Sequence, residues 1–312
     1  MTDTAPPHRP LRLGSRASPL AMAQARLAAR ALCDAHGWAE NRVVIVPVTA
    51  SGDKVLDRPL ADIGGKALWT KELDHWLHDG TIDASVHSMK DVETIRPETL
   101  CIAAMLPRAD VRDTLVGAAS IEALPQSGRL GTSSPRRSAQ IRRLRPDIMP
   151  VLFRGNVATR LARLEAGEAD ATLLATAGLA RLGQTHVGTP VPVAQMLPAP
   201  SQGAIGIEVL AGNATIAALV GAVDHRATSD CVHAERAVLE GLDGSCHSPI
   251  AALGTVEQGG HIRLRAEILS PDGTEHIADV RLIDRGDHAA AYALGRELLA
   301  AASPSLRALF TP

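Results

Sequence analysis

One pattern occurs twice in the chain, as RLGSRASP in residues 12–19 and as RLGTSSP in residues 129–135. This repeat decides how the chain is expected to fold. Each copy predicts a short strand, a turn of small polar residues and a helix that begins with proline. Ser18 and Ser134 suit the N-cap, and proline suits the first helical turn because its missing N–H would be unpaired there anyway. The repeat therefore predicts two similar lobes. Such helix starts also form natural anion sites, although two well-capped helices without a ligand explain the pattern equally well.

Strand-like and helix-like segments alternate along the first two thirds of the chain. Apolar residues recur at helical spacing over residues 20–31 and 157–164. Strands that alternate with helices favour mostly parallel sheets with helices on both faces. The predicted strands are residues 9–14, 42–49, 84–89, 100–106, 114–116, 149–153 and 171–175.

The last part of the chain has a different pattern. Residues 261–269 alternate apolar and polar side chains, a Pro-Asp-Gly turn follows, and residues 277–282 continue as a second strand. This pattern predicts an antiparallel hairpin with one face in water. An Ala/Leu-rich helix is expected over residues 289–302. The segment after about residue 225 is therefore predicted to be a small α+β domain.

Composition limits the class of protein. The 312 residues are 46% hydrophobic, 21% charged and only 2% aromatic, with a net charge of −2. This balance is typical of a globular protein with two or three domains, and it offers no general attraction for nucleic acid or an anionic membrane. Residues 1–10 are polar and rich in proline, unlike a signal peptide, and no apolar run is long enough to span a membrane. We therefore expect a cytoplasmic protein.

The four cysteines are far apart in the sequence, so thiols are expected rather than a disulfide framework. Cys33, Cys101 and Cys231 lie in helix-like or strand-like segments and are expected in the core. Cys246 lies in the small-residue stretch GSCHSP (residues 244–249). A lone cysteine is more often structural than functional, yet a thiol in such a loop is accessible enough to form a covalent bond.

Arginine is concentrated between residues 129 and 163. Arginine forks bind carboxylates and phosphates with two parallel hydrogen bonds, so this segment predicts a site for a polyanion. A nucleic-acid site is a poorer explanation, because Phe153 is the only aromatic residue between residues 129 and 163 that could stack on a base. Nine arginines face one acid, Asp147, in this window: Arg129, Arg136, Arg137, Arg142, Arg143, Arg145, Arg154, Arg160 and Arg163.

Two of these arginines are the best candidates for the anion site. Arg136 and Arg137 follow the turn of residues 131–135 directly, where hydroxyl groups, backbone N–H groups and guanidinium groups can converge on one carboxylate. Arg142, Arg143 and Arg145 are expected on a solvated helix face.

Asp91 ends the segment of residues 85–91 (SVHSMKD) after a predicted strand. The carboxyl ends of strands line the ligand crevice in open α/β sheets, so Asp91 is a candidate for handling protons or stabilising a cation. A surface Lys90–Asp91 pair without a role is the plainer alternative. His75 and His78 have no third ligand at a suitable spacing and are expected on a helix surface, so no metal site is predicted.

Eight segments together resemble one family, the hydroxymethylbilane synthases (porphobilinogen deaminases), over nearly the whole chain. Any one of them alone is modest evidence, but eight in the same order are specific. They are residues 15–21, 64–66, 83–91, 131–137, 154–161, 177–183, 202–204 and 246–250.

The resemblance implies an α/β fold of two doubly wound lobes like those of type II solute-binding proteins, with a small C-terminal α+β domain. It implies a first lobe of residues 1–107 and 202–224, a second lobe of residues 108–201, and a third domain of residues 225–312 that carries Cys246 on a loop. The first lobe is then discontinuous in sequence.

The resemblance also implies the chemistry. Such enzymes deaminate porphobilinogen and condense four molecules head to tail on a dipyrromethane primer, releasing linear hydroxymethylbilane and ammonia in heme biosynthesis. The primer is held by a thioether to the cysteine that matches Cys246, and a soft sulfur nucleophile suits that carbon electrophile. Asp91 and Lys90 match the catalytic positions. No metal, nucleic acid or membrane is implied, and the protein is expected to be a monomer.

Matched positions divide into two binding sets. Lys90 and Asp91 belong to the cofactor set, together with Thr132, Ser133, Ser134, Arg136, Arg137, Arg160 and Gln202. The substrate set is Arg16, Ser18, Lys66, Arg154 and Arg181. The chain departs from the usual family pattern at Ala67, Trp69, Ser201 and Ser245, the first two being usually Gly and Phe and the last two usually Gly.

Two other classes of protein compete with this interpretation. A solute-binding protein without enzymatic activity explains the lobes and the arginines, but it has no use for Cys246 and normally carries a secretion signal. An arginine-rich RNA-binding protein predicts a basic chain with aromatic residues, which the composition does not provide.

Overall fold

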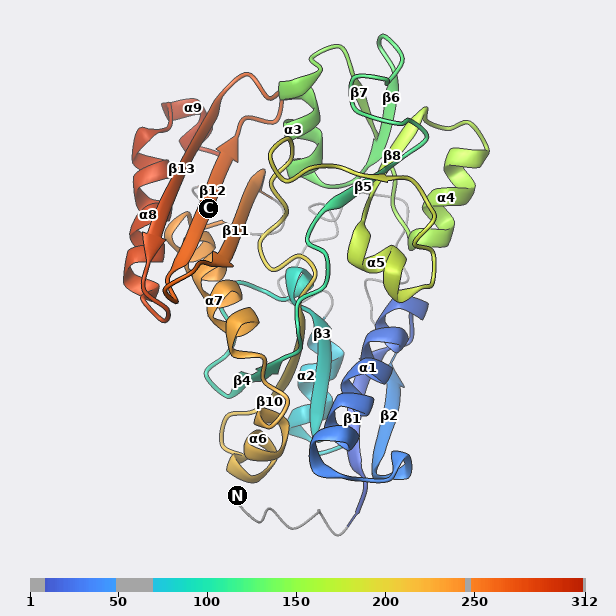
Figure 1. The fold of residues 1–312 in the computed structure, drawn as a ribbon, viewed down its shortest axis with the longest axis vertical. Helices are drawn as coiled ribbons and strands as arrows, with labels where there is room; N and C mark the ends of the chain where they lie inside the picture. Colours follow the sequence, from blue (N-terminus) through green and yellow to red (C-terminus); the bar gives the residue numbers. More distant parts are fainter. Residues whose placement is uncertain (1–8, 49–69, 245–247, 311–312) are drawn as a thin grey trace. The chain divides into compact units, whose positions relative to one another are not determined.

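Both copies of the repeated pattern form a strand followed by a capped helix in the computed structural model (Figure 1). The Ser18 side chain accepts a hydrogen bond from the Ala21 N–H at 3.4 Å, and the Ser134 side chain accepts one from the Arg137 N–H at 3.4 Å. The predicted repeat is therefore confirmed. Its elements are β1 (Leu11–Arg16) with α1 (Pro19–His36), and β6 (Arg129–Thr132) with α3 (Pro135–Leu144).

The structure describes residues 9–48, 70–244 and 248–310. The chain divides into two compact units. Of the described residues, the first unit comprises 9–48, 70–108 and 204–229, and the second comprises 109–203, 230–244 and 248–310. The three-domain division with its boundaries stays a prediction. No helix in the described ranges is long and apolar enough to cross a membrane.

The first unit contains a five-stranded sheet in the order β2-β1-β3-β10-β4. Strand β1 is parallel to β2 and β3, whereas β10 is antiparallel to both β3 and β4. Helices α1 and α6 pack on one face, and α2 packs on the other. A side chain at Gly14 of β1 would collide with Ile82 and Leu73, so glycine lets α2 lie close to the sheet. The remaining elements of this sheet are β2 (Val43–Val48), α2 (Lys71–His78), β3 (Ala84–Ser88), β4 (Leu100–Met105), β10 (Ile205–Leu210) and α6 (Ala214–Gly221), with a short turn η1 (Glu40–Arg42) before β2.

The second unit repeats this topology in a sheet of order β7-β6-β8-β5-β9. Three strands are parallel, and β5 runs antiparallel to β8 and β9. The expectation of mostly parallel sheets is therefore confirmed, with one exception in each described sheet. Four strands of each sheet run in one direction, and β10 in the first unit and β5 in the second run against them. The elements are β5 (Asp113–Val116), β7 (Met149–Leu152), α4 (Val157–Glu165), β8 (Ala171–Ala175), α5 (Thr176–Arg181) and β9 (Thr189–Pro190).

A three-stranded antiparallel sheet, β11-β12-β13, follows in the second unit. The alternation predicted for its central strand is confirmed, since Ile262, Leu264 and Ile268 are buried against helices α7 and α8. Strand β11 was not predicted, because its sequence IAALGTV shows no alternation. The elements are α7 (Arg226–Gly241), β11 (Ile250–Val256), β12 (Ile262–Leu269), β13 (His276–Ile283), α8 (His288–Ala301) and α9 (Pro304–Arg307).

The two α/β lobes and the third sheet confirm the predicted fold class. The seven predicted strands are present, and their ends differ from the prediction by at most two residues. Strand β1, for example, begins and ends two residues later than expected, whereas β8 has the predicted bounds.

Candidate functional site

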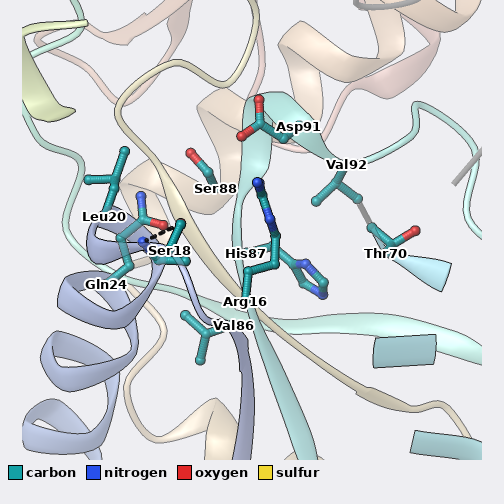
Figure 2. Close-up of a pocket in the computed structure, with 11 residues that line it drawn as sticks. Arg16, Ser18, Leu20, Gln24, Thr70, Val86, His87, Ser88, Asp91 and Val92 are labelled. Carbon is teal, nitrogen blue, oxygen red and sulfur yellow. Dashed lines mark hydrogen bonds between the residues drawn. The ribbon is translucent and has the colours of Figure 1, made fainter. Parts of the chain in front are cut away.

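A pocket in the first unit lies where β1 and β3 end (Figure 2). These strands are parallel, so their carboxyl ends meet at one edge of the sheet, which is where open α/β sheets bind ligands. Arg16 is the last residue of β1, and Ser18 caps the next helix. Both line the pocket together with His87, Ser88 and Asp91 from the end of β3 and the turn after it. The predicted residues Arg16, Ser18 and Asp91 are therefore brought together.

Asp91 lies on the short turn η4 (Met89–Asp91), directly after β3. The turn is held by buried Met89, whose N–H donates to the Ala204 carbonyl at 3.1 Å. Within the described part of the chain, the Asp91 carboxylate has no hydrogen-bond or ion-pair partner. It is half-buried and is therefore available to an occupant of the pocket. Lys90 precedes it on the same turn and is also half-buried. Lys66, Ala67 and Trp69 lie outside the described residues.

A second cluster surrounds the N-terminus of α3 in the second unit. The Ser134 N–H donates to the Thr132 side chain at 3.1 Å, which closes the turn before the helix. Arg160 of α4 reaches the same turn, donating from Nη2 to Ser133 Oγ at 3.4 Å and from Nε to the Gly155 carbonyl at 3.0 Å. Four of the predicted cofactor-binding residues thus lie around one helix start.

Arg136 and Arg137 are buried rather than open, with 3% and 5% of their surfaces exposed. Both pair with Asp113, the first residue of β5. Arg136 Nη2 lies 2.8 Å from Asp113 Oδ2, and Arg137 donates to Asp113 Oδ1 from Nη2 at 2.6 Å and from Nε at 3.2 Å. Burial alone would raise the pKa of Asp113, but the two guanidinium groups hold it well below its usual range.

A second acid belongs to this buried group. Glu267 accepts a hydrogen bond from Gln140 Nε2 at 2.6 Å and attracts Arg136 electrostatically, while burial lowers the pKa of Arg136. Arg136 Nε is buried without a hydrogen-bond partner, whereas Nη1 donates to Gln140 Oε1 at 2.8 Å and to the Leu197 carbonyl at 3.0 Å. An unpaired guanidinium donor in such a group suits an anionic ligand.

Gln202 completes the arrangement around Asp113. Its Nε2 donates to Asp113 Oδ1 at 3.0 Å and to the Val111 carbonyl at 2.8 Å. The preceding residue, Ser201, has a φ of 65°, and its N–H donates to buried Glu235 at 2.6 Å. This left-handed backbone favours glycine, which explains in physical terms why glycine is the usual family residue here.

Arg154 and Arg181 also belong to the second unit. Arg154 is 6% exposed at the end of the β7 segment. Arg181, the last residue of α5, donates from Nη2 to the Gly203 carbonyl at 2.6 Å, next to Gln202. Burial lowers the pKa of Arg181 to about 10.

Two family models match the chain. Residues 11–218 match "Porphobilinogen deaminase, dipyromethane cofactor binding domain", and residues 229–302 match "Porphobilinogen deaminase, C-terminal domain". The chain belongs to the porphobilinogen deaminase family. The match to the first model spans both clusters described above and both α/β sheets.

Curated relatives agree with this membership. A porphobilinogen deaminase of Sphingopyxis alaskensis is 56% identical over 315 residues, which covers 99% of each chain. One of Paracoccus denitrificans is 50% identical over 293 residues and covers 93% of each chain. Among solved structures, the second substrate binding domain of a putative amino acid ABC transporter from Streptococcus pneumoniae matches with a TM-score of 0.41 at 12% identity, covering 68% of this chain and 90% of that chain.

The expected solvated face of arginines is wrong for this member of the porphobilinogen deaminase family. Arg142, Arg143 and Arg145 are half-buried. Arg145 pairs with Asp147 at 2.7 Å and donates to carbonyl groups of residues 121–125, so it ties the end of α3 to the preceding loop. Arg142 donates to the Pro271 carbonyl at 3.3 Å, across to the β12–β13 turn.

Asp113 is the residue that sequence reasoning missed. The arginine-rich segment itself contains one acid, Asp147. Asp113 lies sixteen positions before this segment, at the start of an apolar strand. A useful signal was present. Two adjacent arginines at the start of a helix can both be buried only beside a counter-ion. The pair therefore predicts an acid at the end of a neighbouring strand.

Asp113→Asn is expected to destabilise the protein strongly, because two buried guanidinium groups lose the carboxylate with which both form ion pairs. Removing one member of a buried ion pair costs about 3–5 kcal/mol. Urea unfolding with a spectroscopic readout measures the change in the free energy of unfolding. Asp147→Asn is the control, since that acid pairs with Arg145 near the surface, and it should change stability far less. Equal stability losses in the two variants would contradict the role of Asp113.

Proposed function

We propose that the chain performs the reaction of its family in the pocket of the first lobe. Its activity is that of a porphobilinogen deaminase (hydroxymethylbilane synthase, EC 2.5.1.61) in tetrapyrrole biosynthesis, with a dipyrromethane cofactor. The observation that supports this location is the half-buried carboxylate of Asp91, which has no partner among the described residues and lies in a pocket that Arg16 also lines. A negative charge for the reacting pyrrole and a positive charge for its carboxylates are thereby available in one pocket.

Asp91 is proposed as the catalytic group. As ammonia leaves porphobilinogen, the lone pair of the pyrrole nitrogen is drawn into the ring and positive charge builds on the substrate. A fixed carboxylate offsets this charge, and the benefit is greater in the transition state than in the ground state. The same carboxylate can also accept a proton when the new pyrrole–pyrrole bond has formed. Lys90 on the same turn is proposed to pair with a carboxylate.

The residues around α3 fit a dipyrromethane, which carries acetate and propionate groups. The two guanidinium groups of Arg136 and Arg137 support this assignment, as does the unpaired Nε of Arg136. Thr132, Ser133, Ser134, Arg160 and Gln202 are proposed to complete the cofactor site, with Lys90 and Asp91. When bound, the dipyrromethane supplies the pyrrole carbon that attacks the activated substrate. Its attachment to Cys246 is proposed from the family pattern, because Cys246 lies outside the described residues.

Substrate carboxylates are assigned to Arg16, Ser18, Lys66, Arg154 and Arg181. Arg16 and Ser18 line the first-lobe pocket, which supports their role. Arg181 is held near Gln202 through the Gly203 carbonyl, so its guanidinium group is positioned beside the cofactor set of the second lobe.

Arg136→Ala is expected to weaken binding of primer or substrate roughly 10- to 150-fold, the effect of losing one charge-assisted hydrogen bond of about 1.5–3 kcal/mol. Primer content follows from intact mass, and affinity follows from steady-state assays of porphobilinogen consumption. These assays also test the activity of the unaltered protein.

Arg142→Ala is the matched control on the same helix, because Arg142 contacts only the Pro271 carbonyl among its recorded hydrogen bonds. Urea unfolding of both variants separates a loss of binding from a loss of folding. Normal primer content and kinetics in both variants would contradict the anion site at Arg136.

We further propose that the protein works as a monomer in the cytoplasm, with porphobilinogen as its small-molecule substrate. Cys33, Cys101 and Cys231 carry no disulfide within the described residues, which is compatible with a reducing compartment. Size-exclusion chromatography with light scattering tests the oligomeric state, and cell fractionation tests the compartment.

A further inference from the structure

A buried cluster of charged side chains lies beside the pocket of the first lobe, and none of the roles above uses it. Glu208 on β10 is fully buried and receives two hydrogen bonds from Arg96, from Nε to Oε1 at 2.8 Å and from Nη2 to Oε2 at 3.0 Å. His87 on β3 lines the pocket (Figure 2), and its Nε2 lies 3.1 Å from Glu208 Oε2 and 2.8 Å from Ser85 Oγ.

Glu208 decides which nitrogen of His87 carries hydrogen. Burial alone would raise the pKa of Glu208, but His87 and Arg96 lower it to about 2, so the carboxylate is ionised at neutral pH. An ionised carboxylate only accepts hydrogen bonds, so His87 Nε2 must be the donor. In a neutral imidazole the other nitrogen, Nδ1, is then an acceptor.

The same distances exclude a serine–histidine–glutamate relay. In such a relay the hydroxyl and the acid contact opposite nitrogens of the imidazole. Here Ser85 and Glu208 both contact Nε2. Nδ1 has no recorded partner in the described ranges. His87 lines the pocket although only 5% of its side chain is exposed, so Nδ1 is the ring nitrogen left for an occupant.

We propose that His87 binds porphobilinogen through Nδ1, which accepts a hydrogen bond from a nitrogen donor of the substrate, the aminomethyl group or the pyrrole N–H. This inference rests on the proposed function, because it takes the pocket to be the substrate site. We take the imidazole as neutral, because a charged ring has no acceptor nitrogen and would repel the cationic aminomethyl group. Glu208 touches no substrate and acts as a positioning residue that keeps hydrogen on Nε2.

Arg96 has two further acid partners, and one of them provides a control. Arg96 Nη1 donates to Glu93 Oε2 at 2.7 Å, and Arg96 Nη2 donates to Asp74 Oδ1 at 2.6 Å. The Asp74 side chain thus shares Arg96 with Glu208 but, among the described residues, has no recorded hydrogen bond to His87 or to a residue that lines the pocket. Asp74→Asn therefore disturbs the cluster without altering the contact between Glu208 and His87.

Nitrogen-15 NMR of the full-length, primer-bearing protein with labelled histidines tests which ring nitrogen of His87 carries hydrogen. The His87 signals are assigned by their loss in His87→Gln. We expect a neutral ring with hydrogen on Nε2 in the unaltered protein and in Asp74→Asn. In Glu208→Gln the new amide can donate to Nε2, so hydrogen should move to Nδ1. A charged ring, or hydrogen on Nδ1 in the unaltered protein, would overturn the inference.

Steady-state kinetics test the contact with substrate. Glu208→Gln should keep its primer and lose about tenfold in kcat/KM, the effect of one oriented hydrogen bond to a charged group, whereas Asp74→Asn should stay near normal. His87→Asn keeps an acceptor near the Nδ1 position and His87→Gln keeps a group near Nε2, so His87→Asn should be the more active. If Glu208→Gln fails to fold, the comparison of His87→Asn with His87→Gln still tests the contact between His87 and the substrate.

Two kinetic outcomes separate the inference from the function on which it rests. Normal kcat/KM in a folded Glu208→Gln, or higher activity in His87→Gln than in His87→Asn, would end the role of His87 and leave the proposed function intact. An unaltered protein that carries its primer yet consumes no porphobilinogen would instead end the proposed function.

Discussion

Replacing Cys246 by alanine is expected to give a folded protein that carries no dipyrromethane and has no measurable deaminase activity. Alanine has no sulfur with which to form the thioether, so the primer cannot be retained and chain growth has no starting point. The fold should persist, because the neighbouring residues in the sequence are small and polar. Intact mass and peptide mapping report the primer, and a porphobilinogen assay reports the activity.

Cys101→Ala is the control for this experiment. Cys101 lies half-buried on β4, and burial raises the pKa of its thiol, so it is a poor nucleophile at neutral pH. That variant should keep both primer and activity. An unaltered protein isolated at its bare sequence mass from cells that make porphobilinogen, or a Cys246→Ala variant that still carries the added mass, would contradict the attachment site.

Asp91→Asn should lower turnover by at least about a hundredfold, the usual scale for losing one preorganised electrostatic group. Asparagine keeps the shape of the side chain but removes the charge that opposes the positive charge on the substrate. The structure strengthens this expectation, because no recorded partner of Asp91 within the described residues would be left unpaired by the change. The variant should therefore fold and keep its primer. A steady-state assay beside an intact-mass measurement checks both statements.

Two further variants sharpen the test of Asp91. Asp91→Glu keeps the charge and moves it by one methylene group, so it should be more active than Asp91→Asn. Asp34→Asn removes an exposed acid from α1 of the same lobe and should leave turnover unchanged. Near-normal turnover in Asp91→Asn would refute the catalytic role. Loss of the primer in that variant would assign Asp91 to cofactor assembly instead.

Local sequence patterns predicted most elements of the fold. The Ser-Pro starts of α1 and α3 were correct because capping depends on residues adjacent in the chain. Strand β10 was not predicted, and the antiparallel direction of β5 was missed, because strand direction depends on how separate segments enter a sheet. Strand β11 was missed because its apolar run is compatible with several kinds of buried structure.

The candidate site was predicted unevenly. Asp91, Arg16 and Ser18 were correctly expected at strand ends or helix starts, and one pocket contains them. The roles assigned to them, like those of Lys66 and Cys246, stay predictions. For Arg136 and Arg137 the motif indicated anion binding, and the structure adds an internal anion, Asp113, that the motif does not contain.

The sequence by itself determined the two-lobe architecture, the family and the chemical types of the candidate residues, because these depend on short-range patterns and on motif order. Only the tertiary structure decided which of the charged and titratable side chains pair with one another. Asp113 meets Arg136 and Arg137 from a separate strand, and Glu208 meets His87 across two strands 121 positions apart in sequence. Burial explains why these contacts matter. A charged group removed from water is stable only beside a partner, and that partner can come from any part of the chain.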